Sequence, residues 1–152
     1  MARPAGAYLD SLLKIDKAYR RYVQDKLEEY RLTPCEVAVL LFLYNNAPER
    51  DTASDIARSK GLSKGHVAQA VEALCRRGYL RALRDERDRR LVHLSLGDSG
   101  GPVGRHIEDA HQSFICAVER SISADELERA RLTLSKLAQN AENLVQKGDR
   151  HE

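Results

Sequence analysis

The sequence predicts a mainly α-helical protein with one small β-hairpin. Two observations lead to this fold class. Apolar residues recur at helical spacing along most of the 152 residues, and the period changes to two only between residues 79 and 96. Two short helices joined by a glycine turn precede that stretch, and a hairpin after such a pair is typical of a winged helix-turn-helix. We therefore expect a winged helix-turn-helix lobe at residues 32–97.

Long amphipathic helices are predicted on both sides of this lobe. Residues 8–30, 102–120 and 124–145 each carry an apolar stripe. A winged helix does not need these helices, so their apolar faces require a partner, and soluble oligomers are most often two-fold dimers. We expect an N-terminal dimerisation helix at residues 1–31 and C-terminal dimerisation helices at residues 98–152.

Hydroxyl residues mark the helix starts inside the lobe. Thr33 precedes a nearly all-apolar helix, Pro34 to Asn46, which we expect to be the buried rod of the core. Thr52 opens a short helix that ends at Gly61. Ser63 caps the following helix, which continues to about Gly78.

The wing is predicted from the alternating residues that follow. Residues 79–84 and 90–96 read as strands, and the charged segment 85–89 between them reads as the hairpin tip. Ten cations and four acids lie between Arg58 and His93, although the whole chain has a net charge of only +2. Such a block of cations is typical of a surface that binds a polyanion, but it is also found on ordinary solvated surfaces. Charge alone does not decide between these two interpretations.

Several functional classes are not expected. Three scattered cysteines do not make a disulfide framework, and neither a membrane span nor a secretory leader is seen, so we expect a cytoplasmic protein. The sequence has no glycine-rich phosphate loop and no nucleophile elbow, so an enzyme or a cofactor is not expected. No metal site is expected either, because His106, His111 and Cys116 recur at spacings of five, which do not share one helix face.

The sequence resembles the MarR family of bacterial transcription regulators. The resemblance rests on Leu32-Thr33-Pro34, on the Ser63 helix with its Gly78-Tyr79-Leu80 exit, and on the acid- and arginine-rich tip from Asp85 to Arg90. It implies winged helix-turn-helix lobes on a helical dimer interface, and a repressor that binds double-stranded DNA at a palindromic operator. It also implies that the protein releases DNA when it senses a small aromatic or phenolic ligand, or an oxidant.

The Ser63 helix is the candidate recognition helix, because a duplex is read by a helix that enters the major groove N-terminal end first. Backbone N–H groups at this end suit a phosphate, and lysine, histidine and glutamine side chains suit phosphates or base edges. The alternative is that these are merely exposed polar residues. The candidate contacts on this helix are Ser63, Lys64, Gly65, His66 and Gln69.

The hairpin tip supplies the other candidate contacts. Arg87 and Arg89 suit a narrow minor groove, and the resemblance implies that Asp88 and Arg90 pair to brace the tip. The alternative is a solvated turn with weak surface ion pairs.

Effector sensing has two sets of candidates. Tyr8, Tyr19 and Phe114 are candidate ligand-pocket residues, although core packing is the favoured explanation for them. Cys35 stands at a helix N-terminus, where the dipole lowers a thiol pKa, so it is a candidate redox sensor; a small buried hydrophobe is the commoner case.

Two functions compete. The first is a dimeric DNA-binding regulator; the second is a winged-helix module whose basic face binds an acidic protein. A salt-sensitive interaction with duplex DNA would separate them.

Overall fold

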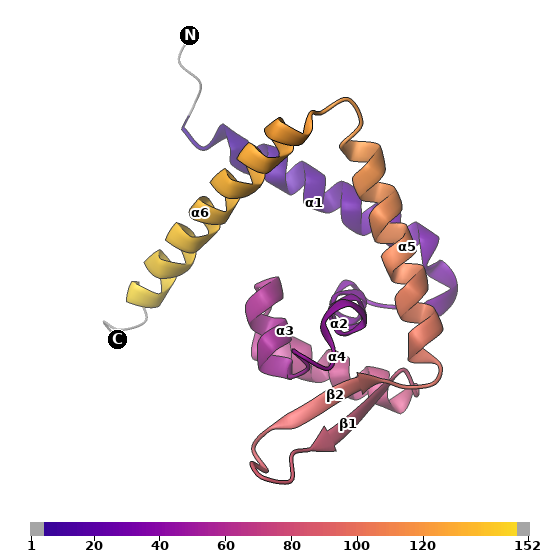
Figure 1. The fold of residues 1–152 in the computed structure, drawn as a ribbon. Coiled ribbons are helices and arrows are strands. Elements are labelled where there is room, and N and C mark those ends of the chain that lie inside the picture. Colours follow the sequence, from indigo (N-terminus) through magenta and orange to yellow (C-terminus); the bar gives the residue numbers. More distant parts are fainter. Residues whose placement is uncertain (1–4, 149–152) are drawn as a thin grey trace. The chain divides into compact units, whose positions relative to one another are not determined.

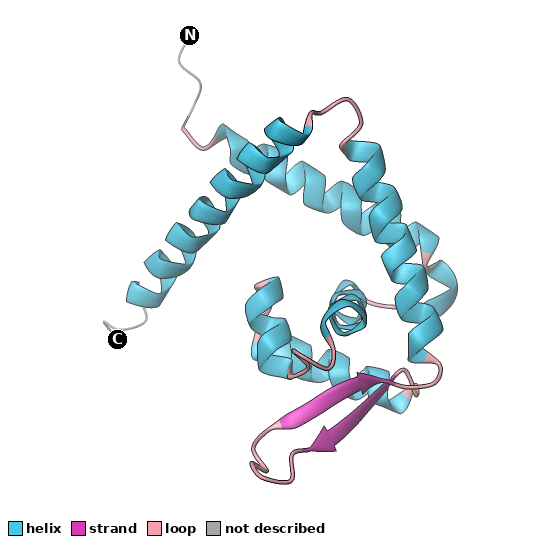
Figure 2. Cartoon of the chain, viewed as in Figure 1, coloured by secondary structure: helices cyan, strands magenta, loops and turns pink. Residues whose placement is uncertain are grey.

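The computed structural model describes residues 5–148; residues 1–4 and 149–152, at the ends of the two predicted dimerisation regions, lie outside the described residues. The predicted fold class is confirmed, because helices predominate and the single described sheet is a two-stranded hairpin (Figures 1 and 2). The elements are α1 (Ala7–Lys26), the 3-10 turn η1 (Glu28–Tyr30), α2 (Pro34–Asn46), α3 (Ala53–Lys60), α4 (Lys64–Arg76), β1 (Leu80–Arg84), β2 (Val92–Leu96), α5 (Gly100–Val118) and α6 (Ala124–Gly148).

The chain divides into two compact units, Met1–Phe114 and Ile115–Glu152, with the boundary inside α5. The first unit contains the complete winged helix-turn-helix and α1. The second contains the last turn of α5 and α6. The division into residues 1–31, 32–97 and 98–152 concerns function and stays a prediction.

The core of the first unit is built around α2. This helix packs against α3, α4 and β2, and its apolar residues are buried on every side, as its composition predicts. The other elements each contribute one apolar face to the same cluster. Its members include Val23, Leu27, Val39, Leu40, Phe42, Leu43, Ile56, Val67, Leu74, Leu94, Val103 and Ile107.

The predicted helix starts are confirmed. Thr33 and Thr52 both form reciprocal capping boxes, with Glu36 and Asp55 respectively. The Ser63 hydroxyl accepts a hydrogen bond from the backbone N–H of His66 at 3.2 Å. Gly61 ends α3 with a φ of 62°, a left-handed conformation that glycine adopts without strain. The tight turn between α3 and α4 therefore follows from local sequence.

The hairpin is antiparallel and its base is anchored in the lobe. Leu80 pairs with Leu96 and Arg84 pairs with Val92. Leu80 and Leu94 are buried, and the Leu94 N–H donates to the carbonyl oxygen of Asp51, in the loop before α3, at 2.9 Å. The far end of the hairpin projects from the lobe (Figure 2).

Several helix boundaries differ from the prediction by a few residues, and two of them have a local backbone cause. The first helix ends at Lys26 rather than near Tyr30, because Leu27 leaves the helical conformation, with φ −114° and ψ 16°, and a separate 3-10 turn follows. The helix after the wing begins at Gly100 rather than near residue 102, because the carbonyl of Gly97 accepts the N–H groups of Gly100 and Gly101 and so starts the turn earlier. Within the described residues, the helices are too short or too polar to cross a membrane.

Candidate nucleic-acid interface

The N-terminal end of α4 is an exposed, polar surface on a firmly seated helix. Val67 and Leu74 are fully buried against the core. Lys64, His66 and Gln69 of the same helix are exposed. Around Gly65 the backbone is open, since a Cβ placed there would meet nothing within 4 Å. The helix therefore presents free N–H groups and three hydrogen-bonding side chains together.

The hairpin tip is folded around the carboxylate of Asp85. One of its oxygens accepts the backbone N–H groups of Arg87 at 2.8 Å and Asp88 at 2.7 Å. These backbone hydrogen bonds, led by that from Asp88, and a hydrogen bond from His93 lower the pKa of Asp85 to about 2. The ionised carboxylate thus shapes the turn that exposes Arg87 and Arg89.

Asp88 and Arg90 form a two-pronged ion pair at the same tip. The Arg90 Nε donates to one oxygen of Asp88 at 3.1 Å and its Nη2 donates to the other at 3.3 Å. Arg90 is therefore engaged within the wing, whereas the side chains of Arg87 and Arg89 extend from it without an ion-pair partner among the described residues.

His93 joins the wing to the rest of the lobe. Its Nδ1 lies 2.9 Å from a carboxylate oxygen of Asp51, and its Nε2 lies 2.9 Å from a carboxylate oxygen of Asp85. These two hydrogen bonds raise the pKa of His93. Sequence reasoning missed this role, because Asp51 is 42 residues away in the chain and no motif links the two.

The cations of the basic block differ in what they contact. Arg58 pairs with Asp55 at 3.1 Å, and Arg81 pairs with Asp98 at 2.8 Å. Arg77 donates to the carbonyl oxygens of Tyr30 and Arg31, so it fastens the end of α4 to the segment before α2. In the part of the chain that the structure describes, the cations of the block without an ion pair on α4 and the hairpin are Lys64, Arg76, Arg84, Arg87 and Arg89.

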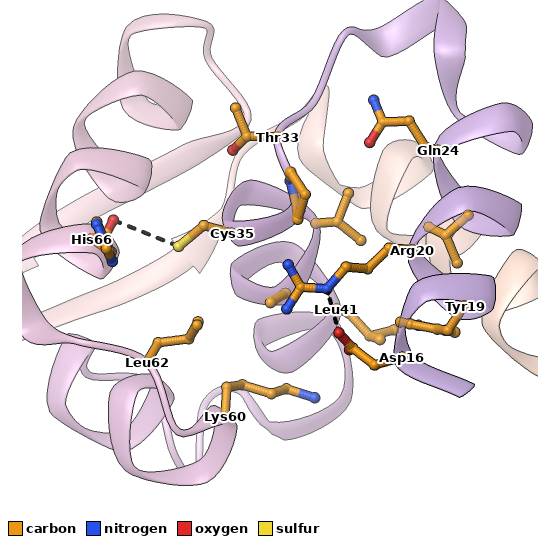
Figure 3. A pocket seen from close by; sticks show the side chains of 14 residues that line it. Asp16, Tyr19, Arg20, Gln24, Thr33, Cys35, Leu41, Lys60, Leu62 and His66 are labelled. Atoms are coloured by element: carbon orange, nitrogen blue, oxygen red, sulfur yellow. Dashed lines mark hydrogen bonds and ion pairs between the residues drawn. The ribbon is translucent and has the colours of Figure 1, made fainter. Parts of the chain in front are cut away.

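A cavity of about 460 Å³ lies between α1, α2 and the α3–α4 turn (Figure 3). Of the three candidate pocket residues, Tyr19 lines it. Tyr8 is exposed near the start of α1. Phe114 is buried and packs edge-on against Tyr19, with ring centroids 5.3 Å apart. The structure therefore brings Tyr19 and Phe114 together but not Tyr8.

Polar groups enter this cavity from three elements. Arg20 of α1 pairs with Asp16 at 2.9 Å. Lys60, at the end of α3, has its pKa lowered by burial, and the charge of Glu108 partly opposes that effect. His66, on the candidate recognition helix, also lines the cavity, so its wall is shared with the α4 surface described above.

The environment of Cys35 runs against a redox role. The thiol donates to the carbonyl oxygen of His66 at 3.6 Å. Partial burial, with a smaller effect from the charge of Glu36, raises its pKa. Burial therefore acts against the lowering of the pKa that a helix N-terminus can give, and the redox role of Cys35 stays a prediction. Reactive cysteines need the opposite shift.

The histidines of α5 are engaged separately. The Nδ1 atom of His111 forms a hydrogen bond with the Tyr19 hydroxyl at 3.1 Å. His106 contacts the Tyr30 hydroxyl. Between residues 5 and 148, no three His, Cys, Asp or Glu side chains are grouped as metal ligands.

These elements define a winged helix-turn-helix protein with one amphipathic helix before the lobe in the sequence and two after it. The MarR family profile matches residues 32–91, and AdcR, a transcriptional regulator of Streptococcus pneumoniae serotype 2 strain D39, is 25% identical over 104 residues, which cover 68% of this chain and 69% of AdcR. Residues 32–91 therefore match the MarR family, and AdcR, the relative that this chain resembles over 104 residues, is a transcriptional regulator.

Solved structures agree on the fold. The S. aureus MepR–DNA complex superposes with a TM-score of 0.76 at 20% identity, covering 91% of this chain and 99% of that chain. MepR in its DNA-binding conformation gives a TM-score of 0.82 at 20% identity, covering 89% and 98%. At this identity the likeness concerns the fold.

Proposed function

We propose that this protein is a dimeric repressor that binds a palindromic operator, with α4 in the major groove and the hairpin tip in the adjacent minor groove. The observation that carries the proposal is the exposure, on one lobe, of the Ser63-capped end of α4 and of the unpaired arginines at the hairpin tip. Its similarity to MepR, a protein solved in complex with DNA, supports the same conclusion.

On α4, the proposed contacts divide by chemistry. The N–H groups at Lys64 and Gly65 and the positive end of the helix dipole bind a phosphate, and the open space at Gly65 lets the backbone approach closely. Gln69, one turn further, has an amide that matches the N6 and N7 atoms of adenine. His66 and the Lys64 side chain reach phosphates or base edges beside it.

At the wing, Arg87 and Arg89 are proposed to bind the minor groove, where narrow A·T tracts concentrate negative potential. The Asp88–Arg90 pair and the Asp85 turn fix the tip before DNA arrives, which reduces the entropy lost on binding.

Dimerisation is proposed from exposed apolar side chains on α1 and α6. On α1, Leu9, Leu12, Leu13 and Ile15 are exposed, with Leu13 reaching 68%. On α6, Leu132, Leu134, Leu144 and Val145 are exposed, with Leu144 reaching 75%. Because monomers rarely leave such contiguous apolar stripes in water, a second copy of the chain is the proposed cover.

The cavity beside Tyr19 is the proposed effector site for a small aromatic or phenolic ligand. Its walls include α1, which carries the proposed dimer contacts, and His66 of the recognition helix. A ligand seated there would change the spacing of these helices, and with it the fit of α4 to the groove. Release of DNA requires only that the ligand bind one arrangement better than the other.

Duplex binding tests the wing. Selection from genomic fragments supplies the probe, and fluorescence anisotropy measures its affinity over a series of salt concentrations. Arg87→Ala and Arg89→Ala are each expected to weaken binding by about 1–3 kcal/mol and to lower the salt slope by about one ion. Arg81→Ala is the matched control, because Arg81 lies on the same hairpin and is already paired with Asp98.

The outcomes separate the competing functions. Unchanged affinity in both tip variants removes the wing from the interface. Failure of the wild-type protein to enrich any duplex at low salt refutes the proposal and favours an acidic protein partner.

Dimerisation is tested by light scattering after size-exclusion chromatography. The wild type is expected at twice the chain mass, and Leu13→Glu is expected to shift it toward the monomer. A wild-type monomer at micromolar concentration refutes the dimer.

A further inference from the structure

The His93 side chain occupies a position that no DNA contact explains. It sits on β2, opposite Leu83 of β1 in the strand register. His93 lies near the turn end of the hairpin. One of its ring nitrogens faces Asp51, in the loop before α3, and the other faces Asp85, in the hairpin turn, both at 2.9 Å. Asp51 and Asp85 are the described charged groups that shift its pKa, and Leu83, on the neighbouring strand, is uncharged.

Both contacts depend on the charge of the ring. Imidazolium donates from both nitrogens, so it satisfies two carboxylates at once. Neutral imidazole donates from one nitrogen and presents a lone pair at the other, which faces a carboxylate lone pair and is repelled. Loss of one proton therefore breaks one of the two contacts and turns the remaining pair of acids into uncompensated like charges.

We propose that His93 is a proton-dependent strap, which fastens the wing to the loop before α3 when its ring is charged and releases the wing when its ring is neutral. The strap joins parts that are otherwise linked by the Leu94–Asp51 backbone hydrogen bond and by the burial of Leu80 and Leu94. The strap acts on the segment that positions the tip, without itself reaching the tip arginines.

The direction of the effect follows from linkage. The pKa of His93 is raised, so the strap is complete below the ordinary histidine pKa and is lost as the pH rises through the raised value. The Asp85 carboxylate stays ionised over this range, because its pKa is about 2. With Asp51 only 13% exposed, its negative charge is poorly solvated once the ring is neutral.

Amide hydrogen exchange measures the strap directly in the intact protein. The probe is the Leu94 N–H, which bonds to Asp51, and its protection factor is corrected for the intrinsic effect of pH on exchange. We expect protection to fall about three- to tenfold between pH 6 and pH 8.5, in parallel with the titration of the His93 ring. The amide of Leu40, buried in α2, serves as the internal reference and is expected to stay constant.

Two variants assign the effect to His93. His93→Gln, whose side chain carries no charge, is expected to show low Leu94 protection with no pH dependence. His66→Gln is the matched control, because His66 is an exposed histidine on α4, and it is expected to keep the wild-type fall. If His93→Gln does not fold, Asp51→Asn replaces it: this variant keeps an acceptor but lacks the charge, so the fall is expected at lower pH.

Three results overturn the strap. The first is that Leu94 protection stays constant while the His93 ring titrates. The second is that the His93 ring titrates at or below the ordinary histidine pKa. The third is that the pH-dependent fall in Leu94 protection persists in His93→Gln, or occurs at the wild-type pH in Asp51→Asn. None of these measurements needs DNA, so the strap and the proposed repressor function fail separately. If the repressor function holds, affinity for the selected duplex at fixed ionic strength also falls with rising pH, and His93→Gln removes that His93-dependent part.

Discussion

Two neighbouring glycines at the start of α5 give opposite predictions for the same substitution. A Cβ at Gly100 would overlap the carbonyl oxygen of Tyr79 and lie 2.9 Å from its carbonyl carbon. A Cβ at Gly101 would meet nothing within 4 Å. Gly100→Ala and Gly101→Ala make the same chemical change in the same turn of α5. They differ in whether the added methyl group meets a neighbouring atom.

The carbonyl of Tyr79 cannot easily move aside at Gly100. Its oxygen already accepts the Gly97 N–H at 2.8 Å, and this bond closes the base of the wing. Overpacking costs about 1–3 kcal/mol and a weakened hydrogen bond about 1 kcal/mol more, so Gly100→Ala is expected to destabilise by about 2–4 kcal/mol. Gly101→Ala is expected to stabilise by about 0.4–1 kcal/mol, because alanine restricts the unfolded chain.

Urea denaturation followed by circular dichroism measures both variants at one protein concentration, since dimerisation couples to unfolding. In thermal unfolding, Gly100→Ala corresponds to a loss of about 4–16 °C for a chain of this size. Equal midpoints for the two variants would refute the close approach of Gly100 to Tyr79.

Three further predictions concern the cap, the thiols and the hairpin turn. Ser63→Ala removes the acceptor for the His66 N–H and is expected to destabilise the protein by about 0.5–2 kcal/mol, measured by urea denaturation; an unchanged midpoint would mean that the cap is not formed. Cys116 is exposed and Cys35 has a raised pKa, so at pH 7 Cys116 is expected to react with a disulfide reagent about tenfold faster, and faster labelling of Cys35, read from peptide masses, would contradict this. The pKa of Asp85 is lowered, so its contribution to the turn is present above its ordinary pKa and is lost as the pH falls toward about 2; protection of the Asp88 amide is expected to fall over that range in the wild type but not in Asp85→Asn, and equal profiles would exclude the carboxylate as the cause.

Local signals in the sequence were enough to predict the lobe. The capping boxes at Thr33 and Thr52, the cap at Ser63 and the glycine at position 61 are each decided by hydrogen bonds within a few residues, so their outcome is visible in short segments. The all-apolar composition of α2 likewise predicted its burial. Helix ends are predicted less accurately, because the end of α1 depends on the backbone conformation of Leu27 and the start of α5 depends on a carbonyl contributed by Gly97.

Contacts between distant segments escaped prediction. The pKa of Cys35 is governed by burial beneath α4, which helix position alone does not reveal. Arg77 contributes to the basic block in sequence, yet it donates to backbone carbonyls 46 and 47 residues away. The candidate DNA contacts and the Tyr8, Tyr19 and Phe114 pocket remain predictions, since the free chain places these residues without the molecules they would bind.

The pairing of charges in the wing bears on how the basic block should be read. Counting charges treats Asp85 and Asp88 as neutralising two arginines. In the folded hairpin the Asp85 oxygens instead accept backbone N–H groups and the His93 ring, while Asp88 is bound to Arg90. The acids therefore hold the turn, and Arg87 and Arg89 extend from it without ion pairs among the described residues. A tip of the same net charge but with its acids placed elsewhere would lack this turn, so we infer that the order of acids and arginines, rather than their balance, determines whether the wing can present its cations to DNA.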